Sequence, residues 1–161
     1  MQNLIIYHEG FDKVVMDSSS REIWKPRGYI ETIVEQNWKQ FSDNPFVWDG
    51  PLVRLESSYQ NGGALHLTTS STSYKYHCGT KHMHSAEDRA NPIYVCASIT
   101  TADEKLVLGL RNNTAKENGL YSIAGGGVDP ELDSPDSVPS LDSALFREIY
   151  EEFGIFPSSC N

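Results

Sequence analysis

The chain has 161 residues, of which 39% are hydrophobic and 22% charged, a composition typical of a folded protein with one ordinary core. Its formal net charge of −9 argues against binding a nucleic-acid backbone, because that mode needs clustered Lys and Arg. No apolar run approaches a membrane span, and three irregularly spaced cysteines do not suggest a disulfide framework. We therefore expect a cytoplasmic protein without nucleic-acid or membrane partners.

Residues 1–90 are predicted to form an α+β extension made of hairpins and one helix. Leu4 to Tyr7 and Val14 to Met16 are short strand-like runs, and the polar residues between them suggest a hairpin. Residues 18–20, all serine, are expected to be a loop. From Tyr29 to Phe41 the apolar residues keep helical spacing, which predicts a helix packed in the core.

A second hairpin is predicted further along the extension. A strand from Leu52 to Glu56 returns through a glycine-containing turn to an alternating strand from Ala64 to Thr69. Residues 70–73 are rich in hydroxyl groups and are expected to be a connection, and the residues from Tyr74 to Thr80 fit no single element. The extension is thus predicted to be mostly strand.

Four potential zinc ligands follow in a loose group. His77, Cys78, His82 and His84 match no closed Cys/His motif, because structural zinc sites usually bring two paired sets of ligands. Ordinary surface or loop histidines are the better account, with a zinc module as the alternative.

A second region is predicted over residues 91–161. Residues 93–100 and 105–111 are β-prone and are joined by a turn, which predicts two antiparallel strands. A third strand-like run, Tyr121 to Ala124, precedes a triple glycine at residues 125–127. We expect the glycines to form a tight turn that lets the backbone approach a ligand closely.

The last predicted element is an amphipathic helix that begins near Ser140 and ends at Gly154. Its apolar stripe, at spacings of four residues, consists of Leu141, Leu145, Ile149 and Phe153. Its carboxylates Glu148, Glu151 and Glu152 share one flank of the helix, where hard oxygen ligands suit Mg²⁺. A solvated acidic face is the alternative interpretation of the carboxylates.

A strand, a glycine turn and a helix carrying the sequence REIYEEFGI resemble the Nudix box of Mg²⁺-dependent hydrolases that cleave a nucleoside diphosphate linked to another group. The second half of the family pattern is matched at every fixed position from Arg147 to Ile155. The first half departs from the pattern in two ways. Counting back from Arg147 places Pro139 at the position of the family's first Glu, and the stretch of residues 128–138 is longer than the spacing in the family. We expect metal binding to survive without that Glu.

The resemblance implies a role for each matched residue. The implied metal ligands for Mg²⁺, or Mn²⁺ as the alternative, are Glu148, Glu151, Glu152 and a backbone carbonyl, that of Gly126. Glu151 or Glu152 could act as the base through water. Arg147 would hold a carboxylate or loop carbonyls with its planar fork. Arg111 is a candidate phosphate contact, with a plain strand-end arginine as the alternative.

Three further motifs look like the Nudix branch that hydrolyses UDP-glucose. They lie in residues 46–55, 72–80 and 91–92, and that branch also has an N-terminal extension and an insertion between the glycines and the helix. The resemblance implies an α/β fold, a Nudix-type α/β/α sandwich with a mixed sheet. It implies cleavage of a nucleoside diphosphate sugar such as UDP-glucose to a nucleoside monophosphate and a sugar 1-phosphate.

The sequence continues for only seven residues after Gly154, whereas a Nudix domain adds further strands and a second helix. We therefore expect residues 91–161 to be the N-terminal half of a Nudix domain, incomplete at the C-terminus. A fragment, completion by a second chain such as a homodimer partner, or a shortened module would each account for this. The alternative function is accordingly a truncated or inactive Nudix-like nucleotide-binding or interaction module.

Overall fold

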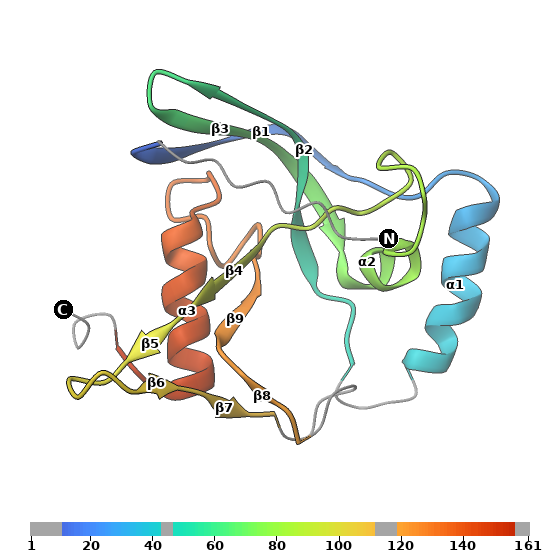
Figure 1. Cartoon of the computed structure of the whole chain (residues 1–161). Helices are drawn as coiled ribbons and strands as arrows, with labels where there is room; N and C mark the ends of the chain where they lie inside the picture. Colours follow the sequence, from blue (N-terminus) through green and yellow to red (C-terminus); the bar gives the residue numbers. More distant parts are fainter. Residues whose placement is uncertain (1–10, 43–46, 112–118, 157–161) are drawn as a thin grey trace.

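The computed structural model describes residues 11–42, 47–111 and 119–156, and it is a mixed α/β fold (Figure 1). The helices in these ranges are α1 (Tyr29–Phe41), α2 (Tyr74–Thr80) and α3 (Leu141–Phe153). The longer strands are β1 (Lys13–Ile23), β2 (Pro51–Asn61), β3 (Ala64–Ser73), β4 (Tyr94–Ala97) and β9 (Ala124–Gly127). Four strands have two residues each: β5 (Ile99–Thr100), β6 (Leu106–Val107), β7 (Gly109–Leu110) and β8 (Tyr121–Ser122).

The first sheet has the order β1-β3-β2 and contains the predicted second hairpin. β2 and β3 pair antiparallel from Asn61 and Ala64 outward, and the two residues between them, Gly62 and Gly63, have positive φ. Such a two-residue turn matches the twist of the strands that it joins, which explains the tight hairpin. β1 runs parallel to β3 on its other edge.

Two predicted loops in this sheet are wrong. Residues 18–20 lie within β1, and residues 70–73 extend β3 to Ser73. Hydroxyl side chains bond to backbone groups and so do not by themselves exclude a strand; Thr69 Oγ1 donates to the Asp17 carbonyl at 3.1 Å across the β1–β3 pair. The predicted hairpin partner at residues 4–7 lies outside the described residues.

A first hydrophobic cluster joins α1 and α2. It contains Ile30, Val34, Tyr76 and Ala90. The predicted helix from Tyr29 to Phe41 is confirmed as α1, and the unassigned segment from Tyr74 to Thr80 is α2. Gly79 lies so close to Val34 that a Cβ there would overlap its side chain, so the glycine permits close packing of the two helices.

The second cluster consists of Met16, Val53, Leu67, Val128 and Ala144. Its members come from both predicted regions. Backbone bonds join the same parts, because Val53 N–H donates to Val128 O at 2.8 Å and Ile93 N–H donates to Val53 O at 2.8 Å. The boundary near residue 90 stays a prediction, and packing across it is extensive.

The predicted strands at residues 93–100 and 105–111 are confirmed, each divided into two short strands at Ser98 and Leu108. The predicted glycine turn is wrong, because residues 125–127 lie in β9 and pair antiparallel with β4. α3 packs against both strands, as Figure 1 shows. Glycines in β9 serve close packing rather than a change of chain direction.

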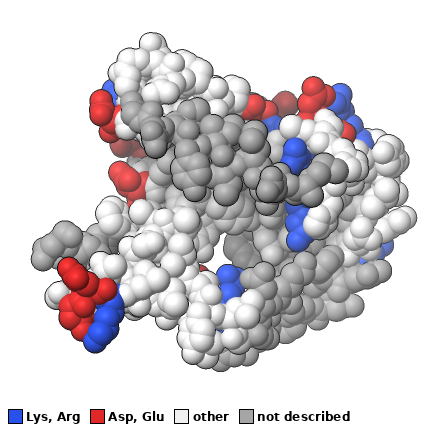
Figure 2. Space-filling model, in the orientation of Figure 1, with Lys and Arg blue, Asp and Glu red and all other residues white. Residues whose placement is uncertain are grey.

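None of the helices in the described ranges has the length and apolar content that a membrane crossing requires. On the face drawn in Figure 2, the Lys and Arg side chains of the described residues are scattered rather than gathered into one basic surface.

Candidate functional site

Helix α3 positions the predicted site residues, and both of its ends are capped. The Ser140 side chain accepts a hydrogen bond from Ser143 N–H at 3.2 Å, as expected of an N-cap. Gly154 takes the left-handed conformation, with φ 66°, and its N–H donates to Tyr150 O at 2.8 Å. Both predicted limits of the helix are therefore confirmed, which fixes the face that Arg147 and the glutamates occupy.

The predicted apolar stripe is buried in part. Ile149 is buried and the other three predicted residues are half-buried, whereas Ala144 is fully buried although the pattern did not single it out. A small residue at that position lets the helix approach the cluster around Val53 and Val128.

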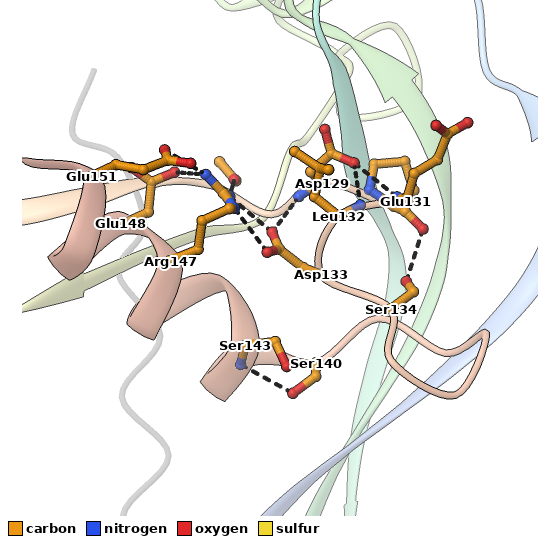
Figure 3. Close-up of polar contacts among 12 residues, drawn as sticks. Asp129, Glu131, Leu132, Asp133, Ser134, Ser140, Ser143, Arg147, Glu148 and Glu151 are labelled. Carbon is orange, nitrogen blue, oxygen red and sulfur yellow. Dashed lines mark hydrogen bonds and ion pairs between the residues drawn. The ribbon is translucent and has the colours of Figure 1, made fainter. Parts of the chain in front are cut away.

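Arg147 lies at the centre of a polar network and uses every nitrogen of its guanidinium (Figure 3). Nε and Nη2 donate to the two carboxylate oxygens of Asp133, both at 2.8 Å, in a bidentate pair. Nη2 also donates to Gly127 O at 3.1 Å. Nη1 donates to Glu148 Oε1 at 2.8 Å and to Glu151 Oε2 at 3.1 Å. One side chain thus joins the helix, the glycine strand and the intervening loop.

Asp133 is the strongest of these partners and was not among the predicted site residues. It is 0% exposed, and its carboxylate also accepts from Asp129 N–H at 2.8 Å. The loop is fixed further because Ser140 N–H donates to Asp133 O at 2.8 Å, and Asp129 Oδ1 accepts from the N–H groups of Glu131 and Leu132. Asp133 raises the pKa of the Arg147 guanidinium, which keeps the arginine charged.

Pro139, which counting back from Arg147 places at the motif's first glutamate, is not among the residues that bind Arg147 in the described parts of the chain. The carboxylate that pairs with Arg147 in the loop is Asp133, which lies six residues after Gly127 and is separated from Arg147 by thirteen residues. Counting forward from the glycines, rather than back from the arginine, would have identified it.

Two glutamates lie directly against β9. A Cβ at Gly126 would overlap the Glu148 carboxylate, so only glycine leaves room for it there. Glu152 Oε2 accepts from Gly125 N–H at 2.9 Å. The Glu151 side chain is 53% exposed and shares the Arg147 Nη1 atom with Glu148. The three glutamates lie on one helix flank, where two of them bind Arg147 and Glu152 binds a backbone N–H.

Glu148 is the least exposed of the three, with a side chain 12% accessible to solvent. Burial raises its pKa, the Arg147 charge lowers it, and the charges of Glu151 and Glu152 raise it again. A carboxylate in such surroundings is stabilised by any additional positive charge.

The carboxylates on α3 offer suitable donors for a divalent cation but are not gathered around one point. In the described parts of the chain, no group of three or more His, Cys, Asp or Glu side chains is gathered as a metal site would require. Two of these carboxylates do share one positively charged group, because Arg147 Nη1 lies 2.8 Å from Glu148 Oε1 and 3.1 Å from Glu151 Oε2. Oxygen donors on one flank of a helix are nevertheless the kind of ligand that Mg²⁺ and Mn²⁺ prefer.

The other predicted residues lie apart from this network. Arg111 follows β7, its N–H donates to Leu120 O at 2.9 Å, and its charge acts on Tyr74. Burial and Cys78 raise the pKa of Tyr74 to about 12, and Arg111 opposes that rise. His77 lies between the rings of Tyr74 and Tyr94. Arg111 is therefore placed near α2, and its predicted phosphate contact stays a prediction.

The motifs outside the network stabilise the fold. Asp49 accepts from Lys75 N–H at 2.8 Å, and buried Arg54 lies over the Trp24 ring at 4.7 Å and pairs with Glu56.

No protein-family model matches this chain, and no curated protein matches it.

Proposed function

We propose that the chain is a Nudix-type hydrolase that cleaves the pyrophosphate of a nucleoside diphosphate sugar such as UDP-glucose. The observation that carries the proposal is the network of Arg147, which joins Asp133, the glycine strand and two glutamates. On an ordinary acidic helix face we would not expect a buried carboxylate such as Asp133 to hold an arginine between two further carboxylates, here Glu148 and Glu151. Gly126 adds support, because the absence of a side chain there leaves room for Glu148 against β9.

A Nudix-type sandwich is the finer fold that we propose for residues 91–161. Its support is the position of α3 on one face of β4 and β9, and the contact of His77 in α2 with Tyr94 in β4. Val95 packs toward the core near Ala144, so Tyr94, the adjacent strand residue, points to the other face. α3 thus lies on one face of this small sheet, and the His77 ring of α2 contacts Tyr94 on the other.

In the proposed reaction, water attacks one phosphorus of the pyrophosphate, a P–O bond forms, and the bridging P–O bond breaks. Glu148, Glu151 and Glu152 would hold Mg²⁺, which when bound supplies positive charge for the pyrophosphate and lowers the pKa of water. The proton of the attacking water passes to Glu151 or Glu152. UDP-glucose would yield UMP and glucose 1-phosphate.

The chain's own residues have separable tasks in this scheme. Arg147 and Asp133 fix the helix against the loop, so the glutamates keep one orientation relative to the substrate. The Gly125 N–H holds Glu152 beside β9. Glu151 and Glu152 are both exposed, so either carboxylate can pass a proton to bulk water.

A specific observation favours a second candidate, an interaction module that binds without turnover. The strand residues Leu106, Leu108 and Leu110 are all exposed, together with Tyr121, which pairs with Leu110. Contiguous exposed apolar side chains are typical of surfaces that contact another polypeptide. Under this alternative a second chain covers the face, and nucleotide binds without product formation.

Hydrolysis of UDP-glucose beside other nucleoside diphosphate sugars, with Mg²⁺ and with chelator, tests the proposal. We expect UMP release only with metal, and we expect Glu152→Gln to lower the rate by orders of magnitude, since it removes a negative oxygen ligand. Glu131→Gln is the matched control, because Glu131 is exposed on the loop and should keep full activity. Folded protein that binds nucleotide but releases no UMP would favour the interaction module instead.

A further inference from the structure

A cavity of about 350 Å³ lies beside α2, away from the Arg147 network. Its lining comes from the end of α2 and from the loop before β4, and consists of His77, Lys81, His82, Arg89, Ala90, Asn91 and Pro92. Two of these residues are permanent cations and two are imidazoles. No Asp or Glu of the described residues lines the cavity, in a chain whose net charge is −9.

The cations of this cavity differ from five other cations of the described residues, which pair with carboxylates. Arg27, Arg54, Lys75, Lys105 and Arg147 each form an ion pair with Asp or Glu. Within the described ranges, neither Lys81 nor Arg89 has a carboxylate within ion-pair distance. The Arg89 Nε atom is moreover buried and has no hydrogen-bond partner among the described residues. A buried donor without an acceptor costs free energy.

The fold holds the two sides of the cavity together firmly. Thr80, the last residue of α2, is fully buried, and its Oγ1 accepts from Ala90 N–H at 3.0 Å and donates to Tyr76 O at 2.7 Å. Asn91 adopts a left-handed conformation, with φ 41°, and its side chain donates to Ala86 O at 2.9 Å. These bonds attach the loop that carries Arg89 to the helix that carries His77.

The electrostatics of the lining favour a negative occupant. Burial lowers the pKa of His77, and the Lys81 charge acts in the same direction, so the two groups are close enough to repel when both are charged. The Arg89 fork matches the geometry of an oxyanion, and Lys81 adds a point charge at the exposed rim.

We propose that this cavity binds the phosphate group of a small molecule, with Arg89 and Lys81 as its cationic contacts. The cavity volume lies at the low end of the range of small-ligand pockets, roughly 300–1,000 Å³, so a phosphate on a single sugar ring fits its size. The site is independent of the carboxylates on α3 and requires no metal.

Titration of the whole chain with inorganic phosphate, glucose 1-phosphate and glucose, in chelator and followed by amide NMR, tests this site. We expect saturable shifts at residues 89–91 with both phosphates and none with glucose. Lys81→Met and Arg89→Met should each weaken binding about tenfold or more, the loss of one charged hydrogen bond. Lys39→Met, an exposed cation of α1 outside the lining, should bind as the parent does.

Because Lys81 is exposed, its variant should fold whatever Arg89→Met does, and the amide spectrum reports folding in each case. Binding of glucose 1-phosphate but not of inorganic phosphate would show that the sugar contributes, and binding of both with equal strength would make the phosphate sufficient. Absence of saturable shifts, or binding that Lys81→Met in folded protein leaves unchanged, would overturn the proposal. Neither result depends on the hydrolysis of UDP-glucose.

Discussion

The two charged regions of this molecule are organised in opposite ways. On α3, Arg147 binds Asp133, Glu148 and Glu151, and Glu152 binds a backbone N–H. Beside α2, Lys81 and Arg89 line a cavity without a carboxylate. The first arrangement fixes side chains in position, whereas the second leaves positive charge available to a ligand. The predictions below alter one region at a time and so separate positioning from ligand binding.

Asp133→Ala should have the largest effect on stability. It removes the bidentate partner of a half-buried guanidinium and leaves Arg147 without its main counter-charge, which costs about 3 kcal/mol for a buried pair. Urea unfolding followed by circular dichroism measures the change. Asp136→Ala, an exposed aspartate of the same loop, is the control and should change stability by less than about 0.5 kcal/mol. Equal effects of the two variants would contradict the role given to Asp133.

The neighbouring glycines should respond differently to the same substitution. In Gly125→Ala the new methyl meets the Val95 carbonyl and the Cys96 backbone, which cannot move easily, and we expect a loss of about 1–3 kcal/mol. In Gly126→Ala the methyl meets only the end of the Glu148 side chain, which can rotate away. That variant should lose little stability but should bind divalent cations more weakly.

Thermal unfolding of both variants and a Mn²⁺ titration of each check this difference. The double variant Gly126→Ala with Glu148→Ala should show no additional cost from the methyl, because the overlapping carboxylate is gone. A Gly126→Ala protein that binds Mn²⁺ like the parent would show that the position of Glu148 against β9 is unimportant.

Thr80→Val should produce a smaller effect, in the other region. It removes both hydrogen bonds of a buried hydroxyl and leaves the Ala90 N–H unpaired, at a cost of about 1–2 kcal/mol. Thr100→Val, on the exposed side of β5, is the isosteric control and should be nearly neutral. If Thr80→Val is also neutral while phosphate shifts persist, then the loop before β4 is held by other contacts.

Helix α3 shows how far the sequence alone could predict this fold. Its spacing, its serine start and its glycine end are local signals, and they are confirmed at Ser140 and Gly154. The strand segments at residues 18–20 and 70–73 were not predictable from local signals. Hydroxyl-rich segments become strands only where a neighbouring strand pairs with them, and that pairing is a tertiary contact.

The candidate site, like the fold, was predictable from the sequence only where its signals are local. The residues from Arg147 to Glu152 follow a fixed helical spacing, so their shared flank could be derived from the sequence. Asp133 lies in an irregular loop with no periodic spacing relative to α3, so the sequence around Arg147 does not indicate which distant carboxylate the arginine binds. The cavity beside α2 depends on Thr80 joining the helix to Ala90, a tertiary contact without a sequence pattern.

The most direct test of the central claim, that the α3 glutamates form a divalent-cation site, is a Mn²⁺ titration followed by electron paramagnetic resonance. Comparison of the parent chain with Glu148→Gln and Glu131→Gln needs neither substrate nor turnover. We predict one saturable site that Glu148→Gln weakens at least tenfold and Glu131→Gln leaves unchanged. A folded parent chain without a saturable site, or equal binding by all three proteins, would contradict the account.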